Sequence, residues 1–117
     1  MNKTFLESRE FSEWVKTYLT DDELAALQRS LLADPDAGSV IPGCGGLRKL
    51  RIGDPRRGQG KRGGARVIYV HVEEASLIYL VTVYGKDQKD DLSNEDKRAY
   101  RDLARLLKSH AQRSEEA

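Results

Sequence analysis

Four apolar residues near the N-terminus recur at helical spacing. They stand at i, i+3, i+4 and i+7, the pattern of an amphipathic helix: Phe11, Trp14, Val15 and Tyr18. Ser8 is placed to cap the start of this helix, because a serine oxygen accepts hydrogen bonds from free backbone N–H groups. Phe5 lies in a short segment, residues 3–7, that predicts a strand before the helix.

A second helix follows directly. Thr20 and Glu23 have the spacing of a capping box, in which each side chain bonds the other residue's backbone N–H. Leucines continue at helical spacing from Leu24 until Asp34 and Pro35 end the pattern, since proline cannot continue a helix. Residues 38–46 are rich in Gly and predict a loop.

Three strands and a last helix complete the pattern. Residues 47–52, 66–72 and 77–84 are apolar or alternating runs rich in β-branched residues. Ser93 then begins a capping signature, and the apolar stripe after it predicts a C-terminal helix, with residues 109–117 expected to fray. The sequence therefore predicts an α+β fold in the order β-α-α-β-β-β-α. An antiparallel sheet of about four strands would carry two N-terminal helices and one C-terminal helix in a single domain, residues 1–117.

Positive charge is concentrated in one segment of the chain. The formal net charge of the chain is only +1, yet residues 48–66 hold eight Lys or Arg against one acid, Asp54. The remainder of the chain is therefore acidic. Concentrated positive charge of this kind is typical of proteins that bind phosphate backbones. The alternative is a solvated basic loop.

Strand alternation sorts these cations. Lys49 and Arg51 should project from one face of their strand while Leu50 points to the other. Arg66 opens the next strand on a face shared with Ile68. Between these strands lies a Gly-rich loop that can mould itself to a phosphate backbone but cannot read sequence. The cations predicted to bind RNA are Arg48 and those of this loop: Arg56, Arg57, Lys61 and Arg62.

Other classes of site are not supported. Gly60 and Lys61 are followed by Arg62, so the Ser or Thr of a nucleotide-binding P-loop is missing. Cys44 is the single cysteine, and neither His71 nor His110 stands at metal-ligand spacing, so we expect structural or surface roles for both histidines. We therefore predict no metal and no cofactor. No apolar run reaches the roughly 20 residues of a membrane span, and the N-terminus has no signal-like stretch, so we expect a cytoplasmic protein without a membrane partner.

Three segments together resemble a known family. They are GGLRKLR at residues 45–51, GKRGGARVIY at residues 60–69 and LVTVYGK at residues 80–86. In this order they resemble the RelE/HigB toxins of bacterial toxin–antitoxin pairs, a branch of the RelE/ParE superfamily, and most closely the HigB branch. The resemblance covers nearly the whole chain and implies a RelE-like fold.

The resemblance implies a ribosome-dependent ribonuclease that cuts messenger RNA in the ribosomal A site without a metal ion. In that chemistry the ribose 2′-hydroxyl attacks its own 3′-phosphate, so cations and one acid/base group suffice. Lys49 and Arg51 match the family's paired strand cations, and Arg66 matches its phosphate-clamping arginine. Tyr84 and Lys86 lie near the family's last catalytic position.

The resemblance leaves the general base open among Lys49, Tyr84 and Lys86. Several family members carry a catalytic Tyr or His near the C-terminus, whereas residues 112–117 contain neither. The implied partners are the ribosome with its message and a HigA-like helix-turn-helix antitoxin, with operator DNA bound only through the antitoxin complex. Two alternatives remain: a non-enzymatic, ParE-like inhibitor of DNA gyrase, and a plain nucleic-acid-binding module.

Overall fold

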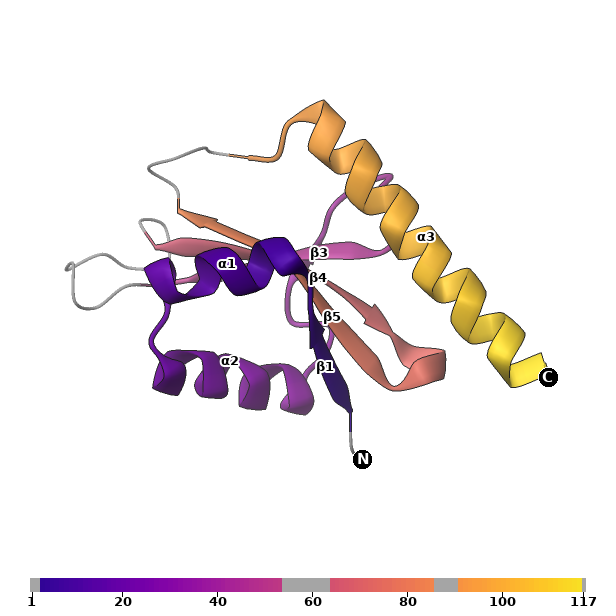
Figure 1. Ribbon diagram of the computed structural model, residues 1–117, viewed down its shortest axis with the longest axis horizontal. Helices are drawn as coiled ribbons and strands as arrows, with labels where there is room; N and C mark the ends of the chain where they lie inside the picture. The colour runs from indigo at the N-terminus through magenta and orange to yellow at the C-terminus, as the bar shows by residue number, and fades with distance from the viewer. Residues whose placement is uncertain (1–2, 54–63, 86–90, 117) are drawn as a thin grey trace.

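A five-stranded sheet with helices on both faces organises the chain (Figure 1). The computed structural model describes residues 3–53, 64–85 and 91–116, the last five of these as helix backbone alone. The elements in chain order are β1 (Thr4–Glu7), α1 (Arg9–Tyr18), α2 (Asp21–Ala33), β2 (Ser39–Val40), β3 (Leu47–Ile52), β4 (Ala65–Val72), the 3₁₀ turn η2 (Glu73–Ala75), β5 (Leu77–Gly85) and α3 (Asn94–Glu116).

The sheet order is β1-β5-β4-β3-β2, and the α+β fold class predicted from the sequence is confirmed. Two details differ from the prediction. β2 adds a fifth strand inside the segment predicted as a loop, because two residues are too few to show alternation. β1 pairs with β5 in the parallel direction, so the sheet is mixed. Such long-range pairing leaves no local trace in the sequence.

The two faces of the sheet carry separate cores. α1 and α2 bury Phe11 and Leu31 against the face that holds Val67 and Tyr69. α3 contributes Ala104 to the other face, which holds Ile68, Val70 and Tyr84. Figure 1 shows α3 lying apart from the α1–α2 pair. Successive residues of β4 thus enter opposite cores, as strand geometry requires.

The predicted helix caps are present in the structure. The Ser8 hydroxyl accepts the Phe11 N–H at 2.9 Å and also donates to the carbonyl of Val81, which ties the start of α1 to β5. Thr20 and Glu23 form the reciprocal capping box of α2, with N–H···O distances of 2.8 and 3.1 Å. These local signals fix where α1 and α2 begin.

α3 is longer than the apolar pattern indicated. Ser93 caps it through the Asp96 N–H at 3.0 Å, and the helix continues to Glu116, because the polar residues beyond Ser109 are mostly good helix formers. The expected fraying of residues 109–117 stays a prediction. No helix in the described part of the chain is long and apolar enough to cross a membrane.

Gly64 lies directly before β4, against the end of β3. A Cβ at this position would overlap the backbone carbonyl oxygen of Ile52 and lie 2.8 Å from its carbonyl carbon. Backbone atoms cannot move aside cheaply, so we expect Gly64→Ala to lower the free energy of unfolding by at least about 2 kcal/mol. Urea denaturation followed by circular dichroism measures this.

Gly43 provides the control for that substitution. Its φ is +69°, but a Cβ at this position would meet nothing within 4 Å apart from its own chain neighbours. Gly43→Ala should therefore cost only the left-handed backbone strain, about 1 kcal/mol. Equal effects of the two substitutions would show that the close contact at Gly64 is not the cause.

Candidate functional site

Three neighbouring strands place a row of polar side chains on one face of the sheet. Arg51 of β3 is paired with Arg66 of β4, and Arg66 is paired with Tyr84 of β5. Lys49 stands two residues before Arg51, opposite Ile68. Directly paired residues of antiparallel strands project from the same face. Lys49, Arg51 and Arg66, here named the cationic face, therefore share the α3 side of the sheet.

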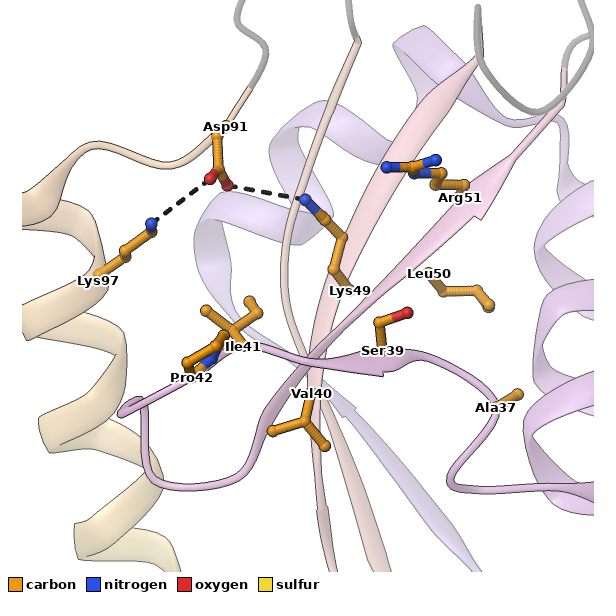
Figure 2. A pocket seen from close by; sticks show the side chains of 10 residues that line it. All are labelled: Ala37, Ser39, Val40, Ile41, Pro42, Lys49, Leu50, Arg51, Asp91 and Lys97. Carbon is orange, nitrogen blue, oxygen red and sulfur yellow. Dashed lines mark hydrogen bonds and ion pairs between the residues drawn. The ribbon is translucent and has the colours of Figure 1, made fainter.

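A pocket of about 470 Å³ opens over β3, and we call it the β3 pocket (Figure 2). One wall is the segment from Ala37 to Pro42, which includes β2, and the other is the start of α3. Among the residues that the structure describes, three cations line it, Lys49, Arg51 and Lys97, against one carboxylate, Asp91. Figure 2 shows the head groups of Lys49 and Arg51 on the same side, with Leu50 directed away from Lys49. The site therefore attracts anions.

Asp91 lies between two of these cations. Its Oδ1 is 3.8 Å from Lys49 Nζ, and its Oδ2 is 3.4 Å from Lys97 Nζ (Figure 2). Burial alone would raise the pKa of Asp91, but the N–H of Leu92 and the charges of Lys49 and Lys97 outweigh it and hold the pKa below its usual range. The carboxylate is therefore ionised at neutral pH.

Arg66 is held inside the protein rather than displayed on its surface. Only 4% of the residue is exposed, and its Nη1 donates to the carbonyl oxygen of Gly64 at 3.2 Å. A guanidinium fixed in this way keeps its direction without losing side-chain entropy when a ligand arrives. The pairing with Arg51 places it at the inner side of the cationic face.

Tyr84 could abstract a proton only as a phenolate, which requires a lowered pKa. For that role, neighbouring cations would have to lower the pKa of the phenol. Instead, burial and the charge of Asp91 raise the pKa of Tyr84 to about 12, against the lowering effect of Arg66 and Arg51. The phenol is therefore protonated at neutral pH. It can donate a proton or a hydrogen bond, but it is not a resting-state base.

Arg48 faces away from the β3 pocket. It pairs with Tyr69, on the α1–α2 side of the sheet. Its Nη1 donates to the carbonyl oxygens of Gly38 and Asp36 at 2.8 and 3.1 Å, and Tyr69 donates to the carbonyl of Pro35 at 2.8 Å. These contacts fix the segment that leads into the pocket wall. Arg48 thus has a structural role here, and its RNA contact stays a prediction.

The remaining predicted residues lie outside the described part of the chain. This applies to the loop cations predicted to bind RNA and to one catalytic candidate: Arg56, Arg57, Lys61, Arg62 and Lys86. Of the predicted catalytic residues, the structure therefore brings Lys49, Arg51, Arg66 and Tyr84 to one face.

The sequence patterns did not indicate Lys97 and Asp91 as site residues. A signal for Lys97 existed, because it follows Ser93 within the first turn of α3. Cations are unfavourable there, since the N-terminus of a helix carries partial positive charge. A lysine at such a position calls for a reason beyond helix stability.

A contact between α1 and α3 holds the start of α3 in place. The Tyr100 hydroxyl donates to Glu10 Oε2 at 2.8 Å, which links the two helices past β5. Burial and the Glu10 carboxylate raise the pKa of Tyr100. Tyr100 is one turn beyond Lys97, so this contact lies close to the part of α3 that lines the β3 pocket.

Metal-binding groups do not gather in the part of the chain that the structure describes, where no three His, Cys, Asp or Glu side chains are close enough to hold an ion. His71 instead contacts Asp36 Oδ1 at 3.4 Å and Lys3 Nζ at 3.0 Å, on the side of the sheet away from Lys49. This agrees with the structural or surface role expected for this histidine.

Comparisons of the sequence and of the structure with known proteins both match RelE toxins. Residues 3–116 match the sequence model of a family described as the RelE toxin of the RelE / RelB toxin-antitoxin system. Among solved structures, a double mutant of E. coli toxin RelE in the free state is 18% identical with a TM-score of 0.53, covering 77% of this chain and 90% of that one.

Two further structures from E. coli are similar. The intact RelBE toxin-antitoxin complex contains a chain 17% identical with a TM-score of 0.52, covering 72% of this chain and 96% of that one. The isolated RelE toxin is 18% identical with a TM-score of 0.51, covering 87% and 99%. At these identities the structures show a shared fold.

Proposed function

Because the chain belongs to the RelE family of toxins from toxin–antitoxin systems, we propose that it is an endoribonuclease that cuts messenger RNA in the ribosomal A site. The observation that carries this proposal is the cationic face: Lys49, Arg51 and Arg66 come from adjoining strands and lie on one side of the sheet. A reaction whose transition state gains negative charge on phosphorus needs positive groups that are already in position.

The proposed step is attack of a ribose 2′-oxygen on the adjacent 3′-phosphorus. The new P–O bond forms as the bond to the 5′-oxygen of the next nucleotide breaks, which leaves a 2′,3′-cyclic phosphate and a 5′-hydroxyl. One proton leaves the 2′-hydroxyl and one joins the 5′-oxygen, so the chemistry balances without a metal or a cofactor.

Each candidate catalytic residue that the structure describes has a role in this step. Arg66 binds the scissile phosphate through charge-assisted hydrogen bonds, and Arg51 stabilises the charge of the phosphorane. Tyr84, protonated at neutral pH, supplies a proton to the leaving oxygen. Lys49 is our first candidate for the base, because a lysine amine can accept the 2′-hydroxyl proton once the ammonium has given up its own proton, whereas a guanidinium stays protonated. Lys86 remains the second candidate.

The proposed role of Tyr84 predicts a simple pH behaviour. We expect Tyr84→Phe to slow cleavage by about tenfold or more, and by the same factor from about pH 6 to pH 9, because the phenol does not titrate in that range. Single-turnover cleavage on programmed ribosomes measures this. A defect that grows steadily with pH would identify Tyr84 as a base and contradict the assignment.

The proposed partners follow from the same function. They are the ribosome with its message, which implies action in the cytoplasm, and an antitoxin that blocks the site. E. coli RelE has a solved complex with its antitoxin. For this chain we propose, from its resemblance to the HigB branch, a HigA-like helix-turn-helix antitoxin, with operator DNA contacted only through the complex.

Mapping RNA 5′ ends after induction in cells tests the proposal. We expect new ends within translated regions, at fixed positions relative to the reading frame, and none in untranslated RNA. Arrest of growth without such ends would favour the gyrase inhibitor, and unaffected growth would favour a plain nucleic-acid-binding module.

A further inference from the structure

Asp91 stands where an anionic ligand of the β3 pocket would bind. Its two carboxylate oxygens face two different ammonium groups, Lys49 at 3.8 Å and Lys97 at 3.4 Å (Figure 2). The two non-bridging oxygens of a phosphodiester can be shared between two lysines in the same manner. The spacing of the two ammonium groups between β3 and the first turn of α3 therefore suits one phosphate.

The contacts of Asp91 with the lysines are loose. Close pairs between an ammonium and a carboxylate lie at about 2.7–2.9 Å, and both distances here are longer. The Asp91 side chain is also half exposed, at 51%. An ion pair of this kind contributes little to stability and is weakened by salt, so a stronger anion can displace it.

The position of Asp91 is nevertheless fixed by its neighbour. Asp91 Oδ1 accepts the backbone N–H of Leu92 at 2.8 Å, and Leu92 is buried at 5% exposure in the α3-side core. The carboxylate is therefore held beside the two lysines by the fold.

Lys97 has no evident benefit for its own helix. It occupies the first turn of α3, where a cation opposes the helix dipole. Its side chain is 32% exposed and lines the β3 pocket. An anionic ligand in the pocket would gain from both the lysine and the partial charge of the helix terminus.

We infer that Lys97 and Lys49 form a phosphate-binding subsite for the RNA substrate, which the Asp91 carboxylate occupies in the free protein until RNA displaces it. The inference rests on the proposed function, because it names how the same pocket receives RNA. Lys97 is thereby a substrate-binding residue. Asp91 is a competitor within the protein, and it lowers the affinity for RNA that is not held in the ribosomal A site.

Binding of a non-cleavable RNA to the full chain tests the inference. The probe is a single-stranded oligonucleotide with 2′-O-methyl groups throughout, which lacks the attacking hydroxyl, and fluorescence anisotropy reports binding across a salt series. Asp91→Asn keeps the oxygen that accepts the Leu92 N–H but removes the charge. We expect it to tighten binding about fivefold near 50 mM salt and to steepen the plot of log K against log salt by about 0.7 or more.

Lys97→Gln should weaken binding by a similar factor and flatten the same plot. In the double variant the gain from Asp91→Asn should be smaller than in the wild type, because one of the two released lysines is missing. Asp102→Asn and Lys16→Gln are the matched controls, since they change the same charges on exposed parts of α3 and α1 outside the pocket. They should leave both quantities nearly unchanged.

Two outcomes would overturn the inference, and they are distinguishable. RNA binding that is measurable but unchanged or weakened by Asp91→Asn would reject the subsite and leave the proposed function standing. Absence of RNA binding in the wild type and in every variant would reject the subsite alone, because the proposed function concerns message held by the ribosome and fails only if that message is not cut.

Discussion

Replacing Arg66 with alanine should abolish growth inhibition and reduce cleavage of ribosome-bound message by about 10²–10³-fold, the cost typical of losing one electrostatic contact to a transition state. The reason lies in its placement. Arg66 is buried, fixed by the Gly64 carbonyl and adjacent to Arg51, so it meets developing charge without rearranging. Induction in cells and cleavage on programmed ribosomes measure the two effects.

Controls for Arg66 must separate charge from packing, because alanine also leaves a cavity. Arg66→Met keeps much of the side-chain volume without the charge and should be as inactive as Arg66→Ala. Arg66→Lys keeps the charge without the planar fork and should retain partial activity. Circular dichroism and antitoxin binding should show that each variant is folded. A folded, fully toxic Arg66→Met protein would remove Arg66 from the mechanism.

Replacing Lys49 with alanine should reduce cleavage by about 10²-fold, the typical contribution of a positioned acid/base group. The informative variant is Lys49→Arg, which keeps the positive charge beside Asp91 but cannot exchange a proton at neutral pH. We expect it to remain at least about tenfold below the wild type in single-turnover cleavage.

Arg51→Lys is the matched control for Lys49→Arg. Arg51 is assigned an electrostatic role alone, so the lysine should retain most of the activity. A fully active Lys49→Arg enzyme would reassign Lys49 to charge stabilisation and leave Lys86 as the candidate base. The Arg51 and Lys49 substitutions together thus distinguish the need for charge from the need for a transferable proton.

Local signals explain how much of the fold could be predicted from the sequence. The strand Leu47–Ile52 and the caps at Ser8 and Thr20 depend on residues close together in the chain, and each is confirmed. β2 was missed because Ser39 and Val40 acquire strand geometry only by pairing with β3. The parallel pairing of β1 with β5 likewise depends on contacts between distant segments.

The candidate site, too, has features that local patterns predict and features that depend on contacts between distant segments. Alternation along one strand predicted Lys49 and Arg51 on a common face, with Leu50 on the other. Arg48 was grouped with the RNA-binding cations, although it lies on the face opposite Lys49. Arg51 is opposite Arg66 because of the register between β3 and β4, and the local sequence patterns did not reveal that register. Asp91 enters the β3 pocket from the segment before α3 and Lys97 from the first turn of α3, so their proximity to Lys49 is a tertiary effect. The pKa of Tyr84 is raised mainly by burial, and burial cannot be read from the composition of the chain.

Cleavage of a defined message on purified ribosomes decides whether the protein is a ribonuclease that uses the 2′-hydroxyl of its substrate. Two messages should be compared, one with ribose throughout and one with a single 2′-deoxynucleotide at the A-site cleavage position. We expect the protein to cut the first, leaving a 2′,3′-cyclic phosphate and a 5′-hydroxyl, and not to cut the second at that position. Equal cleavage of both messages, or ends that carry a 5′-phosphate and a 3′-hydroxyl, would contradict it.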